Sequence, residues 1–118
     1  MIRSYKDLTV WQKAMDLAVE VYRLSRYFPK EENYCLTSQI HRAVVSVPSN
    51  IAEGKERGSA AEYAHFLTIA RGSLAETDTQ LLLAIEFGYI TKEQCVRAFQ
   101  LREEVSKMLA VLLAKIKK

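Results

Sequence analysis

The strongest pattern in the chain is an apolar residue at every third or fourth position between Leu36 and Ile51. At about 100° of rotation per residue, this spacing puts the apolar side chains on one face of an α-helix. Polar residues repeat with the same spacing beside that face, so an amphipathic helix with two distinct surfaces is predicted. The apolar positions are Leu36, Ile40, Ala43, Val44, Val47 and Ile51.

The second line of residues, the polar ladder, combines both signs of charge with small hydroxyl and amide side chains. A helix surface that only meets water is more often rich in Lys and Glu. The ladder is therefore predicted to join subunits or to bind a ligand, and both alternatives stay open. Its members in this helix are Gln39, Arg42, Ser46, Asn50, Glu53 and Arg57.

Pro48 lies inside the same helical pattern. A proline removes one intrahelical hydrogen bond and clashes with the carbonyl four residues before it, so a bend near residues 44–47 is predicted. The freed carbonyl needs another donor, and Ser49 and Asn50 are close enough to provide one. The alternative is that these two poor helix formers are kept for packing or recognition.

Three further helices are predicted, and turn signals separate them. Pro29 stops the first helix and Gly58 ends the second. Ser59–Glu62 and Thr91–Gln94 match the capping box that opens helices, and Gly88 suits a left-handed C-terminal cap. The four predicted helices span residues 8–28, 32–57, 59–88 and 91–118.

The spacing of these helices predicts the fold. At 118 residues with 49% hydrophobic content, the chain suits one domain, residues 1–118, with a real core. Short connections between long helices favour antiparallel neighbours. The predicted fold is all-α, an up-down-up-down antiparallel four-helix bundle whose second helix is kinked at Pro48.

The first and third helices carry more apolar surface than one core needs. The first has a wide apolar side, and the third has Ile69, Leu83 and Phe87 beside its core stripe. Such a surplus predicts contacts between subunits. Gly72 and Ser73 interrupt the third helix with small side chains, and a close helix crossing is predicted there.

Arg102 falls within the apolar stripe of the fourth helix instead of opposite it. A guanidinium in that position needs a carboxylate or carbonyl partner. Glu53, Glu76 and Asp78 are the possible partners. An ion pair within the chain or between subunits is therefore predicted.

Charge is distributed unevenly along the chain. Residues 1–30 hold six Lys or Arg against three Asp or Glu, residues 89–118 hold seven against three, and residues 31–88 hold four against eight. First and last helices are neighbours in an up-and-down bundle, so their cations form a possible site for RNA or DNA phosphates. An ordinary solvated surface is the alternative. The residues of this basic surface are Lys13, Arg23, Arg26, Arg97, Lys107, Lys115, Lys117 and Lys118.

No enzyme, metal site or cofactor is expected. A di-iron bundle needs two Glu-x-x-His pairs, and Glu62 with His65 provides only one. Cys35 and Cys95 lack the spacing of a zinc site and are predicted to be buried, reduced thiols. No apolar run is long enough to span a membrane and the first residues do not form a signal peptide, so a cytoplasmic protein without membrane contact is expected.

Several specific segments are spread over nearly the whole chain. The most specific are Asn50-Ile-Ala-Glu-Gly54 and Ala70-Arg-Gly-Ser73. The others are Leu8…Val10-Trp-Gln-Lys-Ala14, Phe28-Pro29…Glu32, Gln39-Ile40…Arg42-Ala43…Ser46 and Phe66-Leu67…Ile69. Together these segments resemble one bacterial family, the 23S rRNA-intervening-sequence proteins.

The resemblance implies a four-helix bundle that assembles as a homopentamer and binds RNA or DNA. Relatives of the family include the accessory variability determinant of diversity-generating retroelements, a basic pentamer that binds nucleic acid and a reverse transcriptase. The match adds Arg71, Ser73 and Glu76 to the polar ladder, and the ladder is predicted to be a subunit interface. His41 stands where the family often has a second basic residue. The alternative function is a scaffold that holds another protein, encoded nearby, without binding nucleic acid.

Overall fold

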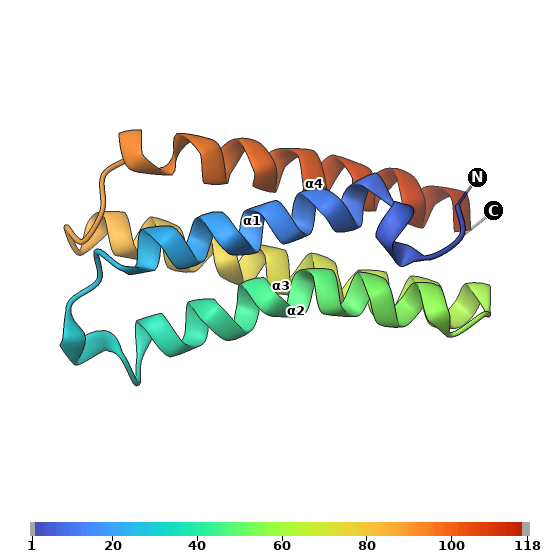
Figure 1. Cartoon of the computed structure of the whole chain (residues 1–118), viewed down its shortest axis with the longest axis horizontal. Coiled ribbons are helices and arrows are strands. Elements are labelled where there is room, and N and C mark those ends of the chain that lie inside the picture. Colours follow the sequence, from blue (N-terminus) through green and yellow to red (C-terminus); the bar gives the residue numbers. More distant parts are fainter. Residues whose placement is uncertain (1, 117–118) are drawn as a thin grey trace.

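The computed structural model describes residues 2–116, which form an all-α four-helix bundle (Figure 1). The predicted fold class is therefore confirmed. Three short 3₁₀ helices, η1 (Tyr5–Asp7), η2 (Lys30–Glu32) and η3 (Glu93–Cys95), precede the first, second and fourth long helices. The long helices are α1 (Thr9–Ser25), α2 (Leu36–Glu56), α3 (Ala60–Glu86) and α4 (Val96–Ile116).

Consecutive helices run in opposite directions in Figure 1. Helix α1 packs against α2 and α4, and α3 packs against the same two helices, most extensively against α2. Helices α1 and α3 therefore lie diagonally across the bundle. The bundle has four sides, and each long helix borders two of them.

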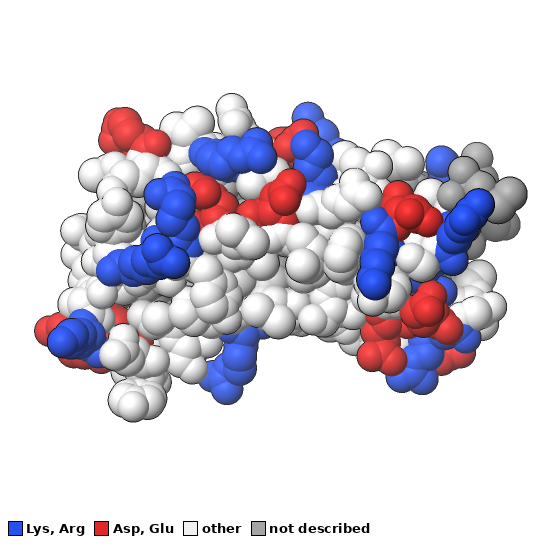
Figure 2. All heavy atoms as spheres, in the orientation of Figure 1, with Lys and Arg blue, Asp and Glu red and all other residues white. Residues whose placement is uncertain are grey.

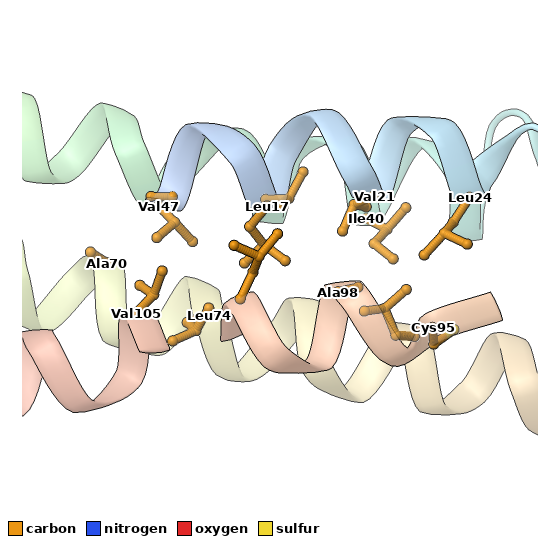
Figure 3. Close-up of a cluster of buried hydrophobic side chains, with 14 of the residues drawn as sticks. Leu17, Val21, Leu24, Ile40, Val47, Ala70, Leu74, Cys95, Ala98 and Val105 are labelled. Atoms are coloured by element: carbon orange, nitrogen blue, oxygen red, sulfur yellow. The ribbon is translucent and has the colours of Figure 1, made fainter. Parts of the chain in front are cut away.

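The core consists of aliphatic side chains from all four helices (Figure 3). Every apolar position predicted for α2 is buried, which confirms the helical periodicity there. Burying aliphatic side chains stabilises a fold by about 1.5–3 kcal/mol for each Leu, Ile or Val relative to exposure. The largest fully buried side chains are Leu17, Val21, Leu24, Ile40, Val44, Val47, Ile51, Leu67, Leu81, Leu101, Val105 and Leu109.

The predicted cap at the start of α3 is present, whereas the second predicted capping box forms before η3 and not at the start of α4. The Ser59 hydroxyl accepts a hydrogen bond from the Glu62 N–H at 3.1 Å. Thr91 and Gln94 bond each other reciprocally, at 2.8 Å and 3.2 Å, although this box opens η3 and α4 follows it. Gly58 has φ of 85° and Gly88 has φ of 81°, which glycine adopts without steric cost.

The first two helices are shorter than predicted. Helix α1 ends at Ser25 and α2 begins at Leu36, because the intervening residues form turns and η2. The backbone of Cys35, at φ of −124° and ψ of −106°, is not helical. Glu32 stabilises this connection, since its carboxylate accepts hydrogen bonds from the Leu36 N–H at 3.2 Å and from the Tyr89 hydroxyl at 2.7 Å.

Pro48 is buried within the continuous helix α2, and the bend predicted there stays a prediction. The prediction that Asn50 donates a hydrogen bond to the freed Val44 carbonyl is wrong. The Asn50 amide instead donates to both the carbonyl and the hydroxyl oxygen of Ser46, at 2.8 Å each. Ser49 is exposed.

The close helix crossing lies at Gly54 and not at Gly72. A Cβ added to Gly54 would lie 2.8 Å from the Cβ of Phe66 on α3, whereas a Cβ added to Gly72 would meet nothing within 4 Å. Helices α2 and α3 approach closely only because Gly54 has no side chain. The prediction of a crossing at Gly72 within the chain is therefore wrong.

The two cysteines differ in exposure. Cys95 is buried, as predicted, and burial raises the pKa of its thiol. Cys35 is exposed in the turn before α2, so the prediction that it is buried is wrong. Neither cysteine forms a disulfide.

Candidate functional site

A polar groove of about 460 Å³ runs along the α2–α3 side of the bundle. The structure brings five of the predicted ladder residues into this groove, three from α2 and two from α3. It adds Gln80, which lies one turn beyond Glu76 on α3. The groove is lined by Gln39, Arg42, Ala43, Ser46, Ser73, Glu76 and Gln80.

A hydrogen-bond network at the floor of the groove joins the two helices. The Ser73 hydroxyl donates to the Ser46 hydroxyl oxygen at 2.8 Å, and the Asn50 amide donates to the same oxygen at 2.8 Å. Because Ser46 accepts from both neighbours, its own proton can go to a third group. Thr77, which is fully buried, donates to the Ser73 carbonyl at 2.9 Å. The small polar residues of the ladder therefore fix the register of α2 against α3.

The charged and amide groups above this network have no such partners. Within residues 2–116, Arg42 and Glu76 form no ion pair. The side-chain oxygen of Gln80 is shielded from water and accepts no hydrogen bond from the described residues. Unpaired groups of opposite charge around one groove can bind a molecule or surface that also carries both charges.

The remaining ladder residues do not reach the groove. Glu53 and Arg57 pair with each other at 3.0 Å near the end of α2. Arg57 also lies 3.5 Å from the Glu62 carboxylate and 5.0 Å from the centre of the Phe66 ring. Arg71 is exposed on α3. The ladder predicted as one stripe is therefore divided into a groove and a separate ion-pair cluster.

The neighbouring α1–α2 side of the bundle is apolar and partly open to water. Val19 is 69% exposed, and Met15, Tyr22 and Val45 are 41–43% exposed. In Figure 2 a broad area over α1 and α2 carries no charged side chain. A hollow of about 400 Å³ on this side is lined by Tyr5, Trp11, Met15, Ala18, Val45, Pro48, Ser49 and Ala52.

The surplus apolar surface predicted from the sequence is thus exposed on the folded chain. On α3, Ile69 and Leu83 are 38% and 40% exposed, and Phe87, the residue that follows α3, is 55% exposed. Val19 and Val45 were not predicted as members of the α1–α2 surface. Val19 follows Met15 by one helical turn, so the spacing of α1 contained the signal for it.

The cations predicted as a basic surface are mixed with carboxylates (Figure 2). Lys13 lies 3.3 Å from Glu104, Lys107 lies 3.8 Å from Glu103, and Arg23 pairs with Glu20. The hydrogen bond from Glu20 raises the pKa of the Arg23 guanidinium. These pairs reduce the positive potential along α1 and α4.

Three of the predicted cations, Arg26, Arg97 and Lys115, form no ion pair with another described residue. All three are exposed. Lys117 and Lys118 lie outside the described residues. The basic surface therefore consists, as far as the structure describes it, of three unpaired cations among several neutralised ones.

Arg102 has the ion pair that its position predicts, and the partner is Asp78 of α3. The guanidinium Nε lies 3.1 Å from the Asp78 carboxylate, and a second nitrogen lies 3.0 Å from Glu103. The side chains of Arg102 and Asp78 are 31% and 28% exposed. Among the three carboxylates considered, Asp78 is the one that links α3 to α4 within the chain.

His41 lies at the seam between α1 and α2. Its ring stacks on Tyr22 with the ring centres 3.7 Å apart, and its Nε2 lies 2.7 Å from the Ser25 hydroxyl oxygen. The Ser25 hydroxyl donates its single proton to the Tyr22 carbonyl at 2.8 Å, so His41 is the donor in the other bond. Burial lowers the pKa of His41.

The comparison that decides the family is a match to the model of the 23S rRNA-intervening sequence proteins over residues 6–111. The chain belongs to this family. Among solved structures, the chain is similar to a protein of unknown function from the S23 ribosomal protein family of Bacteroides thetaiotaomicron, whose crystal structure is known at 1.70 Å resolution. The two share 28% identity and a TM-score of 0.81, over 89% of this chain and 98% of the other.

The comparison with curated proteins found no match to the chain. The relation to diversity-generating retroelements expected from the motifs stays a prediction. Within residues 2–116, no three His, Cys, Asp or Glu side chains gather in a group that could hold a metal ion. The same part of the chain contains no helix with the length and apolarity needed to cross a membrane.

Proposed function

We propose that this protein is a non-enzymatic bundle that assembles with copies of itself, as a homopentamer, and binds RNA or DNA through the assembled surface. The observation that carries the assembly is the exposure of apolar side chains on two sides of the bundle. Val19 on α1 and Phe87 at the end of α3 are each more than half exposed. Burying such side chains between subunits is favourable by about 25 cal/mol for each Å² removed from water.

Nucleic-acid binding is supported by Arg26, Arg97 and Lys115, which have no carboxylate partner in the described chain. A monomer with three unpaired cations binds a phosphate backbone weakly. An assembly repeats these cations in every subunit, and repeated weak contacts to one polymer raise the overall affinity. Assembly and nucleic-acid binding are therefore coupled in this proposal.

A scaffold that binds another protein is the second candidate function. The observation that favours it is the neutralisation of Lys13, Arg23 and Lys107 by carboxylates on the same surface. A surface of mixed charge recognises a protein with complementary charges better than it recognises a phosphate backbone. The two functions differ in their dependence on salt and on the unpaired cations.

Light scattering and fluorescence-anisotropy titrations test the proposal together. We expect the mass of a pentamer, and binding of a structured RNA or duplex DNA that weakens as salt rises from 50 to about 200 mM. Changing Arg26, Arg97 and Lys115 to Gln should weaken binding and flatten its salt dependence by about one unit of slope for each lost phosphate contact. Lys55→Gln on α2, where Lys55 lies over the Tyr63 ring, is the matched control. A pentamer that binds neither polymer supports the scaffold instead, and a monomer refutes the assembly.

A further inference from the structure

The pairing of α2 with α3 orders the side chains of the polar groove into levels. The two helices run antiparallel (Figure 1), and the hydrogen bond from Ser73 to Ser46, at 2.8 Å, fixes their register. Arg42 precedes Ser46 by about one helical turn, and Glu76 follows Ser73 by about one turn. Because the helices are antiparallel, Arg42 and Glu76 lie at the same level on opposite walls of the groove.

The charges of the groove balance without meeting. Arg42 and Glu76 are the two charged residues among those that line it. They do not pair with each other or with another described residue. A ligand with a single charge would be attracted by one wall and repelled by the other. A ligand that carries a carboxylate and an ammonium side by side is attracted by both walls.

A second level of the groove offers uncharged hydrogen-bonding groups. Gln39 and Gln80, on opposite helices, lie about one turn beyond the charged pair. The side-chain oxygen of Gln80 is shielded from water and accepts no hydrogen bond from the described residues. An acceptor in this state costs free energy, and a donor on a ligand removes that cost. Ala43 is the one apolar residue of the lining, so the groove favours a polar ligand over an apolar one.

From these observations we propose that the groove binds a free α-amino acid with a polar side chain, its carboxylate on Arg42 and its ammonium on Glu76. The two charges of an α-amino acid are adjacent, which suits two charged walls at one level. A guanidinium binds a carboxylate through two parallel hydrogen bonds. The polar side chain of the ligand extends to the amides of Gln39 and Gln80. This site does not depend on the proposed assembly or on nucleic-acid binding.

Isothermal titration calorimetry of the unaltered chain with L-glutamine tests the site. We expect a dissociation constant on the order of 0.1–1 mM, as for a small ligand in an open groove. Glutaramate lacks the ammonium of L-glutamine, and L-glutaminamide lacks its carboxylate, so each should bind about tenfold more weakly or worse. L-Leucine keeps both charges but has no side-chain donor for the Gln80 oxygen, and it should bind at least about fivefold more weakly.

Two variants assign the charges of the ligand to the walls. Arg42→Gln should weaken L-glutamine about tenfold and leave the affinity for L-glutaminamide unchanged, because that analogue has no carboxylate to lose a partner. Glu76→Gln should weaken L-glutamine by a similar factor and leave the affinity for glutaramate unchanged. Arg71→Gln and Glu86→Gln, at exposed positions of α3 outside the groove, are the charge-matched controls and should bind as the unaltered chain does.

Three results would overturn the amino-acid site. They are no binding of L-glutamine to the unaltered chain, equal affinity for L-leucine, and affinities that stay the same in Arg42→Gln and Glu76→Gln. If these two variants lower the mass in light scattering while L-glutamine does not bind the unaltered chain, a second copy occupies the groove. That result refutes the amino-acid site and leaves the proposed assembly standing.

Discussion

At the scale of single residues, the packing of α2 on α3 depends on which glycine has a neighbour. Gly54 and Gly72 both interrupt a helix, and alanine is favoured over glycine by about 1 kcal/mol in a helix interior. Only at Gly54 would the new methyl group collide with a side chain, that of Phe66, at 2.8 Å. The same substitution should therefore have opposite effects at the two positions.

Gly54→Ala should lower the free energy of unfolding by about 1–2 kcal/mol, since the strain of overpacking exceeds the gain in helix propensity. Gly72→Ala should raise it by up to about 1 kcal/mol. Urea denaturation of both variants measures the two changes. Equal effects in the same direction would contradict the close approach at Gly54.

His41 gives the fold a dependence on pH. Burial lowers its pKa below the ordinary value of 6.5, so the unfolded chain binds more protons than the folded chain between the two values. The free energy of unfolding should therefore fall as the pH drops from about 7 through 6.5 and down to the folded-state pKa, and then level off. Protonation puts a charge on the ring that stacks on Tyr22.

Urea denaturation at pH 7 and pH 5 should show a smaller loss of stability for His41→Phe than for the unaltered chain. The phenylalanine keeps a ring against Tyr22 but cannot gain a proton. His65→Gln, at an exposed position, serves as the control and should leave the pH dependence as it is. An identical pH dependence in His41→Phe would show that another group is responsible.

At the scale of elements, the contact between α3 and α4 includes one ion pair at a semi-buried position. The side chains of Arg102 and Asp78 are 31% and 28% exposed, so water partly screens the attraction between them. Such pairs contribute roughly 0.5–1 kcal/mol, and removing one partner also leaves the other charge without compensation.

Arg102→Met and Asp78→Asn should each lower the free energy of unfolding by about 1 kcal/mol, and the double variant should lose less than the two losses combined. A double-mutant cycle by urea denaturation measures this coupling. Arg97→Met, at a cation with no described partner, should change the stability by less than about 0.5 kcal/mol. If the two losses are fully additive, the ion pair does not stabilise the contact between α3 and α4.

At the scale of the whole molecule, self-assembly makes stability depend on protein concentration. Subunits that bind only in the folded state stabilise that state by mass action. A hundredfold increase in concentration should raise Tm by at least about 5 °C for the unaltered chain. The Tm of Val19→Glu, which places a charge on the exposed apolar surface of α1, should stay constant over the same range, as should that of Leu83→Glu on α3.

Differential scanning calorimetry across that concentration range measures the shift. Val111→Glu on α4, where Val111 is 54% exposed, is the matched control and should follow the unaltered chain. This measurement uses no nucleic acid, so it separates assembly from binding. If the Tm of the unaltered chain does not change with protein concentration, the proposed assembly into oligomers is contradicted.

The fold class, the four helices and the core of α2 could be predicted from the order of the residues alone. These follow from local rules, since helix periodicity, capping boxes and turn glycines act within a few residues along the chain. Ser59 caps α3 as predicted for this reason, and the reciprocal bonds of Thr91 and Gln94 form as well, although they precede η3 instead of α4. The start of α2 was misplaced because Glu32 is fixed by Tyr89, a partner 57 residues away.

Which surfaces are open to water and which polar groups have hydrogen-bond partners depends on how the helices pack in three dimensions. The ladder is one stripe in the sequence, yet packing on α3 joins Ser46 to Ser73 and leaves Arg42 and Glu76 without partners in the described chain. The close crossing of α2 and α3 likewise lies at Gly54, because the distance between the two helices decides at which position a side chain would collide. Helical spacing fixes the direction of each side chain, but only the packing of the helices fixes what that side chain meets.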